Sequence, residues 1–423
     1  MKPYYIISVL ILLLSSCVKK FEAPVPDTRW QKFDSAVAMP LLYHTRQKME
    51  GIYSIVEGAG EFGALAAIKW SYKATGTDTS FFISLFCENE VSYFICEARR
   101  LDTNILLNGY WRKMLNTETG KGRFTISQKN GAKHLLSLAA LNSSDSIIIE
   151  GNFGSGTAIP DKTIKLKYLR PLYKATPLQI LAHRGGGRNA DLLPASENSV
   201  EIIKQASQFG ASGVEIDVRL TSDGIPVLYH DAALNERLIQ KNGMVGPIEN
   251  YSYPQLNTLV RLLKGEHIPT LREALNTIVY NTPLRFVWLD TKYDGSLQVV
   301  RDLQKEFINK SVANGRPVDI VIGIPDRTAL NNLLHLSDYR STPSLCELSP
   351  EDVLTSNATI WAPRWTLGIQ NEEVAKMHTQ GRRAFVWTLD VPGSIASFIK
   401  EGNFDGILSN YPSAVAFYYY ARQ

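Results

Sequence analysis

The stretch 215-EIDVRLTSDGIPVLYHD-231 decides how the second half of this chain can fold. It contains two apolar, strand-like runs, and both carry ionisable side chains. The first run holds Glu215 and Asp217, which would point to one face of a strand because side chains alternate along it. The second run ends in His230 and Asp231. Strand-like runs that repeatedly carry such residues predict a functional site at the ends of a sheet.

The runs on either side of this stretch alternate with helical patterns from Pro177 to the C-terminus. Over about 245 residues, this rhythm of roughly eight units favours an α/β fold, a (β/α)8 TIM barrel at residues 178–423. A doubly wound open sheet is the structural alternative. The strand-like runs are QILAH, GVEIDVRL, IPVLYH, LRFVWLD, DIVIGIP, PSLCEL, ATIWAP, RRAFVWTLD and FDGILSN.

Polar residues at the ends of these runs are the candidates for a site, because a barrel of this kind carries its site at the C-terminal ends of its strands. The further residues in such positions are His183, Arg184, Asp290, Lys292, Trp387, Asp390, Ser409 and Asn410. Their recurrence at one run end after another predicts that they share one site.

The paired carboxylates of Glu215 and Asp217 suggest a metal site. Two adjacent carboxylates repel each other, so a cation between them would stabilise both. A hard divalent cation, Mg²⁺ or Ca²⁺, is the natural partner of oxygen ligands, and Asp290 could supply a third carboxylate. The alternative is that the pair forms salt bridges with Arg219 and Lys292.

Two histidines at run ends, His183 and His230, are suited to acid–base chemistry near neutral pH. Arg184 offers a planar fork of N–H donors that matches the oxygens of a phosphate. The glycines at 185–187 would let the backbone approach a ligand closely, although they could equally form an ordinary loop.

The chain before residue 175 has a different character. Short β-rich segments separated by turn signals at residues 36–173 predict a smaller all-β sandwich or barrel, and its strand-edge aromatic–glycine pairs resemble small lipocalin-like barrels. No cluster of charged residues or histidines there suggests catalysis, so a binding or packing module is expected. Residues 174–177 form the linker to the second domain.

The N-terminus resembles an export signal. Its apolar run is too short to span a membrane comfortably, and LSSC resembles the bacterial lipoprotein signal. This predicts a signal peptide at residues 1–16, an acylated Cys17 and a tether at 17–35, in a protein exported to the periplasm or cell surface and anchored to a membrane by lipid. A plain secretion signal is the alternative.

Cysteine count and net charge set two further bounds. Export would expose the chain to an oxidising compartment, where Cys87 and Cys96 could form a disulfide across a hairpin or stay as buried free thiols. The formal net charge of +4 is too small to indicate nucleic-acid binding.

The combined motifs resemble those of the glycerophosphodiester phosphodiesterase family. The segments HRGG, PASENS and EIDVRLTSDGIPVLYHD match its pattern, and IPTLREAL, FVWLDTK, VWTLD and FDGILSNYP continue the match to about residue 420. Two departures are present. Asp290 stands where the family usually has Glu, and Ala195 and Ser196 separate Pro194 from Glu197.

The resemblance implies a barrel of the PLC-like phosphodiesterase type with one divalent cation, Ca²⁺ or Mg²⁺. It assigns catalysis to His183 and His230 and metal binding to Glu215, Asp217 and Asp290. It assigns contacts with phosphate or substrate to Arg184, Lys292, Glu197 and Trp387. The implied reaction is hydrolysis of a small glycerophosphodiester to glycerol phosphate and an alcohol. Either histidine could be the acid or the base, and the nucleophile could be water or glycerol's own 2-hydroxyl.

Two other functions remain open at this level. The barrel could bind a headgroup or a glycan without cleaving it, or it could hydrolyse another diester such as a lysophospholipid, sphingomyelin or a polymer. The N-terminal module could present such a substrate, pack against the barrel or hold it off the membrane.

Overall fold

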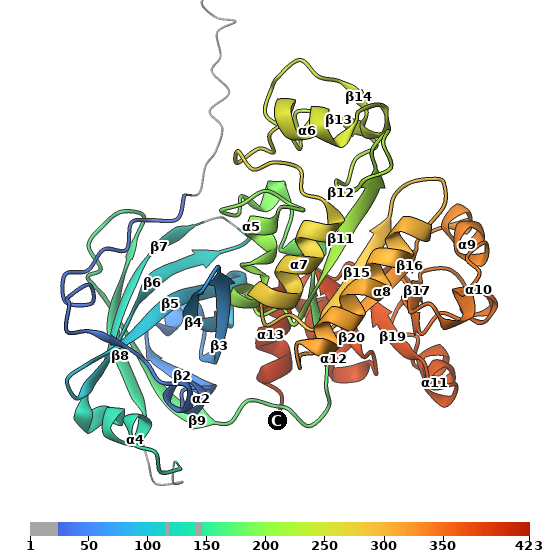
Figure 1. Cartoon of the computed structure of the whole chain (residues 1–423). Helices are drawn as coiled ribbons and strands as arrows, with labels where there is room; N and C mark the ends of the chain where they lie inside the picture. The colour runs from blue at the N-terminus through green and yellow to red at the C-terminus, as the bar shows by residue number, and fades with distance from the viewer. Residues whose placement is uncertain (1–23, 116–117, 141–145) are drawn as a thin grey trace, which may run out of the picture.

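The computed structural model describes residues 24–115, 118–140 and 146–423, which form two barrels that lie side by side (Figure 1). The predicted signal peptide at 1–16, the predicted lipidation site Cys17 and the start of the tether lie outside these residues.

The first barrel is antiparallel and closed. Each of its eight strands pairs with the next along the chain, and the last pairs with the first, which makes an up-and-down barrel. Of the two predicted alternatives, a sandwich and a barrel, the structure has the barrel. The strands are β2 (Gly51–Glu57), β3 (Leu65–Thr75), β4 (Asp78–Cys87), β5 (Ser92–Leu101), β6 (Asn104–Lys113), β7 (Thr119–Ile126), β8 (Ile148–Ser155) and β9 (Lys162–Arg170). Short elements flank them: β1 (Met39–Pro40), α2 (Tyr43–Lys48), α3 (Ala59–Phe62) and α4 (Ala132–Leu136).

Aromatic side chains fill the interior of this barrel. Phe62 packs against Phe94, Trp111 and Phe153, with ring centroids 4.7–5.5 Å apart, at the spacing of favourable aromatic pairs. The centre of the barrel is therefore a packed core.

The cysteines of this barrel are buried free thiols, so the disulfide alternative is wrong. Cys96 on β5 stands opposite Ile83 on β4, four residues away from Cys87. The register of the two strands therefore keeps the thiols apart.

The second barrel is parallel and closed, which confirms the (β/α)8 prediction over an open sheet. Its first strand pairs with both the second and the last, so the eight parallel strands close into a ring. The eight strands are β10 (Gln179–Ala182), β11 (Gly213–Leu220), β15 (Phe286–Thr291), β16 (Asp319–Ile324), β17 (Ser344–Cys346), β18 (Ile360–Trp361), β19 (Arg383–Val386) and β20 (Gly406–Ser409).

Helices follow these strands around the outside of the barrel (Figure 1). They are α5 (Val200–Ile203), α7 (Leu271–Asn281), α8 (Gln298–Ala313), α9 (Arg327–Leu334), α10 (Pro350–Ser356), α11 (Asn371–Thr379), α12 (Pro392–Glu401) and α13 (Pro412–Tyr420). Among the helices within the described ranges, none is long and apolar enough to cross a bilayer.

The run IPVLYH is not one of the barrel strands. Its strand β12 (Pro226–Leu228) pairs antiparallel with the end of β11, so it folds back instead of adding a parallel strand. An insert with β13 (Ala233–Leu234), β14 (Gly246–Pro247) and α6 (Tyr253–Leu259) follows and has its own small hydrophobic core. This return brings His230 beside the end of β11, where Arg219 donates to its carbonyl oxygen.

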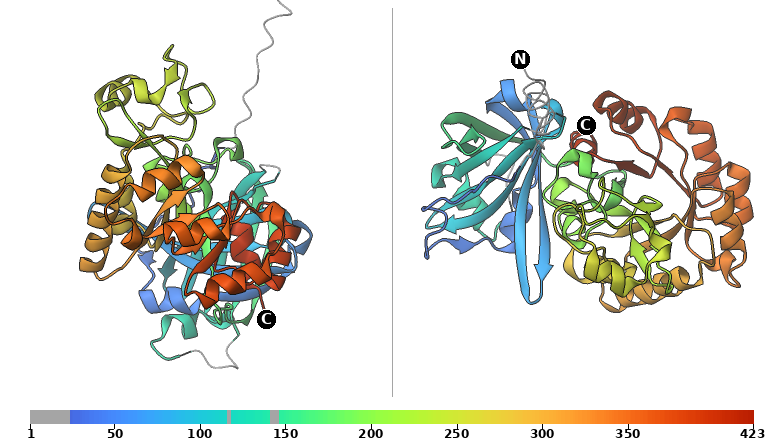
Figure 2. Two further views of the ribbon diagram at one scale, coloured as in Figure 1. Left: turned by 90° about the vertical axis from the view of Figure 1, so that its right-hand side faces the viewer. Right: turned by 90° about the horizontal axis from the view of Figure 1, so that it is seen from above.

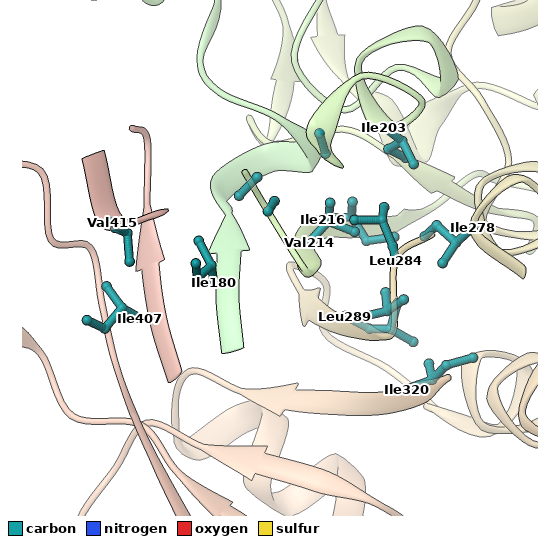
Figure 3. Close-up of a cluster of buried hydrophobic side chains, with 14 of the residues drawn as sticks. Ile180, Ile203, Val214, Ile216, Ile278, Leu284, Leu289, Ile320, Ile407 and Val415 are labelled. Carbon is teal, nitrogen blue, oxygen red and sulfur yellow. The ribbon is translucent and has the colours of Figure 1, made fainter. Parts of the chain in front are cut away.

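Side chains along the parallel strands alternate between the hydrophobic core under the helices and the barrel interior that carries the site. Val214 and Ile216 of β11 and Leu289 of β15 point outward to the helices, as Figure 3 shows. The residues between them point inward, where Phe286 and Trp288 belong to the packed barrel interior. Glu215 and Asp217 share that inward face.

The two barrels share one continuous hydrophobic cluster, and their packing is seen from above in Figure 2. The outer face of β4 and β5 meets α13 and the 3₁₀ helix η5 (Ala206–Phe209). The ring of Tyr93 lies 5.7 Å from that of Phe209. At Gly210, with φ of +95°, an added Cβ would come within 2.6 Å of Ala416 and 3.0 Å of Phe86. The chain therefore needs glycine at this point of closest approach.

Candidate functional site

A cleft of about 270 Å³ opens at the C-terminal ends of the parallel strands. It brings together most of the site residues that the sequence predicted. Its lining residues are His183, Arg184, Glu215, His230, Trp288, Asp290, Lys292, Pro325, Glu347, Arg364, Trp387, Thr388 and Leu408. Asp217 is buried beside Glu215 and Asp290, whereas Glu197 lies behind Arg184 and does not line the cleft.

Three carboxylates cluster on one side of the cleft: Glu215 and Asp290 line it, and Asp217 is buried beside them. Asp217 and Asp290 are direct neighbours across β11 and β15, and Glu215 stands two residues before Asp217. One oxygen from each of the three lies within 4.8 Å of the others. Burial, with Asp217 and Asp290 nearby, raises the pKa of Glu215 well above its ordinary value.

The free oxygens of this trio fit a divalent cation. Glu215 Oε1, Asp217 Oδ1 and Asp290 Oδ1 are each buried without a hydrogen-bond partner, and such acceptors are costly unless a cation or donor meets them. Oxygen ligands at this spacing suit Mg²⁺ or Ca²⁺. Asp290 belongs to the cluster although its side chain is one methylene shorter than Glu.

The alternative of salt bridges to the carboxylate pair is wrong for Arg219 and correct in part for Lys292. Arg219 pairs with Glu249 at 2.9 Å and donates to the backbone oxygen of His230, so it supports the returning strand. Lys292 Nζ lies 2.5 Å from Asp290 Oδ2 and 3.6 Å from Asp217 Oδ1.

His183 directly follows β10, and a chain of hydrogen bonds fixes the tautomer of its ring. The amide nitrogen of Asn410 donates to Asp390 Oδ2 at 2.6 Å, so Asn410 Oδ1 is an acceptor for His183 Nδ1 at 2.7 Å. The lone pair of His183 therefore lies on Nε2, which is 3.8 Å from Glu215. Burial and Arg184 lower the pKa of His183 to about 4, so the ring is neutral near pH 7.

His230 has a charged partner instead. Its Nδ1 lies 2.7 Å from Asp231 Oδ1, and Asp231 also accepts hydrogen bonds from Arg237 and Asn235. Burial opposes ionisation of Asp231, but these hydrogen bonds from Arg237, His230 and Asn235 hold its pKa below the ordinary value. The anion favours a proton on His230 Nδ1, which leaves Nε2 for the cleft.

Arg184 is held at both ends. Its backbone N–H donates to Glu215 Oε2 at 2.8 Å, and its Nη1 donates to Glu197 Oε1 at 2.8 Å. Glu197 is only 2% exposed and also pairs with Arg237 at 3.1 Å. In the structure, Glu197, which the sequence predicted to bind substrate, accepts hydrogen bonds from the two arginines.

The loop to Glu197, where the chain departs from the family pattern, is fixed by the insert. Ser196 donates from its backbone and its hydroxyl to Glu266, at 2.9 and 2.7 Å. Ala195 is buried. The two extra residues are therefore packed into the structure.

Sequence reasoning missed Glu347, Arg364 and Trp288 as lining residues. Glu347 follows β17 directly, and its Oε1 is buried without a hydrogen-bond partner. Burial and Asp290 raise the pKa of Glu347 well above its ordinary value. Arg364 lies 5.0 Å over the ring of Trp387. The rule that the residue ending each apolar run faces the site would have found Glu347.

A hollow of about 530 Å³ on the first barrel is larger than the cleft but differs in chemistry. Its Glu150 and Lys165 pair at 2.9 Å, and Arg123 lies over Trp30 at 5.6 Å. The Glu150 carboxylate is therefore already paired with a cation, whereas the cleft keeps three clustered carboxylate oxygens without hydrogen-bond partners.

Fold and site together define a parallel (β/α)8 barrel whose cleft combines two histidines, two arginines and a lysine with a buried cluster of three carboxylates. Residues 183–320 match the Glycerophosphoryl diester phosphodiesterase family. This match lies within the second barrel and agrees with the resemblance over that segment.

Individual relatives carry related names. Glycerophosphodiester phosphodiesterase 1 of Rattus norvegicus is 31% identical over 147 residues, which are 34% of this chain and 42% of that protein. The chain thus spans less than half of that relative. Glycerophosphodiester phosphodiesterase of Caldanaerobacter subterraneus subsp. tengcongensis is 23% identical over 242 residues, 56% of this chain and 95% of that protein. A solved glycerophosphodiester phosphodiesterase from Parabacteroides distasonis aligns with a TM-score of 0.46 at 23% identity, over 57% of this chain and 96% of that one.

Proposed function

We propose that this protein hydrolyses glycerophosphodiesters to glycerol phosphate and an alcohol. The observation that carries the proposal is the cleft itself, where a neutral histidine, an anion-paired histidine, Arg184 and three carboxylates converge within a domain of the matching family. A headgroup-binding barrel would not need two histidines oriented by separate partners.

Glu215, Asp217 and Asp290 would hold one divalent cation, Mg²⁺ or Ca²⁺, through their buried free oxygens. When bound, such a cation neutralises phosphate charge and stabilises the charge that develops during the reaction. Arg184 and Lys292 border the same cleft and would bind the remaining phosphate oxygens.

The partners of the two histidines suggest their roles. His183 faces the neutral Asn410 through Nδ1, so its Nε2 would accept the proton of the attacking hydroxyl, from water or from glycerol's 2-hydroxyl. The new P–O bond would form as the P–O bond to the leaving alcohol breaks. Attack by water would give glycerol phosphate directly, whereas attack by the 2-hydroxyl would give a cyclic phosphate that a water must then open. His230, paired with the Asp231 anion, would donate the proton that this alcohol needs.

A panel of diesters tests the proposal. Glycerophosphocholine, glycerophosphoethanolamine, a lysophospholipid, sphingomyelin and bis(p-nitrophenyl) phosphate would be assayed with Mg²⁺, with Ca²⁺ and with EDTA. We expect glycerophosphodiesters to be cleaved with a metal and spared with EDTA. Binding of these compounds without cleavage in any arm would favour the headgroup-binding barrel.

We further propose that the chain is exported as a bacterial lipoprotein anchored through Cys17. The support is the short apolar run that ends in LSSC, followed by a short polar tether. Metabolic labelling with a palmitate analogue should mark the wild type. The Cys17→Ala variant should be unlabelled and released from membranes, and labelling of that variant would contradict the proposal.

A further inference from the structure

The first barrel contributes a side chain to the loop that carries Arg184. Arg112 lies near the end of β6 and is 2% exposed, because it enters the boundary between the barrels. Its Nη1 donates to the carbonyl of Leu192 at 2.9 Å, and its Nη2 donates to the carbonyl of Asp191 at 2.6 Å. A planar guanidinium is suited to two such parallel bonds, which lysine cannot reproduce.

The two carbonyl groups lie at the end of a turn and need hydrogen-bond donors from outside it. Asp191 closes the 3₁₀ helix η4 (Asn189–Asp191), and Leu192 follows it in a left-handed conformation with φ of +53°. Carbonyls at the end of a helical turn lack partners within the turn. Arg112 supplies the donors from another domain.

The same turn connects directly to the cleft. Asn189 donates its backbone N–H to Glu197 Oε2 at 2.8 Å and accepts from the backbone N–H of Glu197 at 2.9 Å. Glu197 then accepts from Arg184 Nη1 at 2.8 Å. Through the backbone of the 189–192 turn, these hydrogen bonds connect the first barrel to a side chain that lines the cleft.

We propose that Arg112 is a positioning residue for the phosphate site, so that the first barrel completes the active site of the second. By holding the 189–192 turn, Arg112 fixes Glu197 and through it the orientation of Arg184. The substrate in this inference rests on the proposed function, whereas the positioning of Arg184 rests on the hydrogen bonds alone. It gives the first barrel a role in catalysis besides packing.

The test compares Arg112→Met with Arg170→Met in the full chain. Arg170 is the matched control because it also donates across the boundary, to the carbonyl of Ala421 beyond the end of α13. Hydrogen exchange of the segment 186–199 reports the turn, and calorimetric binding of glycerol 3-phosphate in the presence of Mg²⁺ or Ca²⁺ reports the phosphate site.

We expect Arg112→Met to speed exchange in 186–199 but not in α7. We also expect it to weaken glycerol 3-phosphate binding and raise KM roughly 10-fold, because a displacement of less than about 1 Å should cost less than the roughly 10²-fold that about 1 Å can cost. Arg170→Met should change both by less than about 2-fold. Arg112→Lys should recover only part of the affinity.

Unchanged exchange and affinity in folded Arg112→Met would overturn the proposal. Global unfolding of both Arg112→Met and Arg112→Lys would also overturn it, because the side chain would then serve the whole fold. If the wild type cleaves no glycerophosphodiester, the proposed function fails, but the exchange experiment still tests the hold on the turn.

Discussion

Replacing each histidine separately, His230→Ala and His183→Ala, separates their proposed roles. If His230 protonates the leaving alcohol, its loss should matter only when that alcohol is a poor leaving group. If His183 accepts the proton of the nucleophile, its loss should matter for every substrate.

The magnitude follows from the partners of each ring. His230 is oriented by Asp231 at 2.7 Å, so its removal takes away a fully positioned acid. Loss of a positioned acid or base typically costs 10²–10⁴-fold in rate, or about 2.7–5.4 kcal/mol of transition-state stabilisation. We therefore expect that loss for glycerophosphocholine with either variant. Bis(p-nitrophenyl) phosphate has no hydroxyl of its own, so water must attack it, and its leaving group departs as an anion. His230→Ala should therefore slow its cleavage less than about 10-fold.

The assay measures kcat/KM for both substrates at saturating metal. His267→Ala is the matched control, because His267 also pairs with a carboxylate, Glu273 at 3.3 Å, but lies outside the cleft. It should behave like the wild type. The assigned roles would be refuted if His230→Ala lowered kcat/KM equally for the two substrates. They would also be refuted if His183→Ala left kcat/KM for bis(p-nitrophenyl) phosphate unchanged.

Three further outcomes are expected. Asp290→Asn should weaken Ca²⁺ or Mg²⁺ binding at least about 10-fold by calorimetry, since even outer partners of a metal site matter that much; unchanged affinity would remove Asp290 from the site. Phe86→Ala should lower the free energy of unfolding by roughly 3–5 kcal/mol in denaturant titration, because it opens a cavity between the barrels, and a loss below about 1 kcal/mol would contradict close packing there. Arg272 and Lys310 lower the pKa of Glu306 to about 2, so this carboxylate stabilises the fold above its ordinary pKa of 4.5 and loses that effect as the pH falls toward 2. The Tm gap between wild type and Glu306→Gln should thus be larger at pH 7 than at pH 3, and a gap that widens on acidification would contradict this.

The sequence predicted the second barrel and most of its cleft because both depend on local patterns. Alternation in β11 was enough to put Glu215 and Asp217 on one face, and run ends identified His183 and Lys292. The same reasoning assigned IPVLYH to the barrel, because an apolar run carries no information about whether it pairs parallel or antiparallel.

The contacts that orient the site were beyond the sequence because they join distant segments. Nothing near Arg112 indicates that it meets the carbonyls of Asp191 and Leu192, about eighty residues later. Likewise, Glu197 looked like a substrate contact until the structure placed Arg184 and Arg237 on its two oxygens. Such pairs depend on how whole domains dock, which periodicity does not encode.

Because the two barrels share one hydrophobic cluster, we expect them to unfold as one cooperative unit. Elements that bury apolar surface against each other gain and lose stability together. The linker at 174–177 is thus a boundary in the sequence but not in cooperative unfolding, and the whole described chain should melt in one transition. A shortened chain beginning at β10 would expose the apolar side of η5 and α13, inviting aggregation.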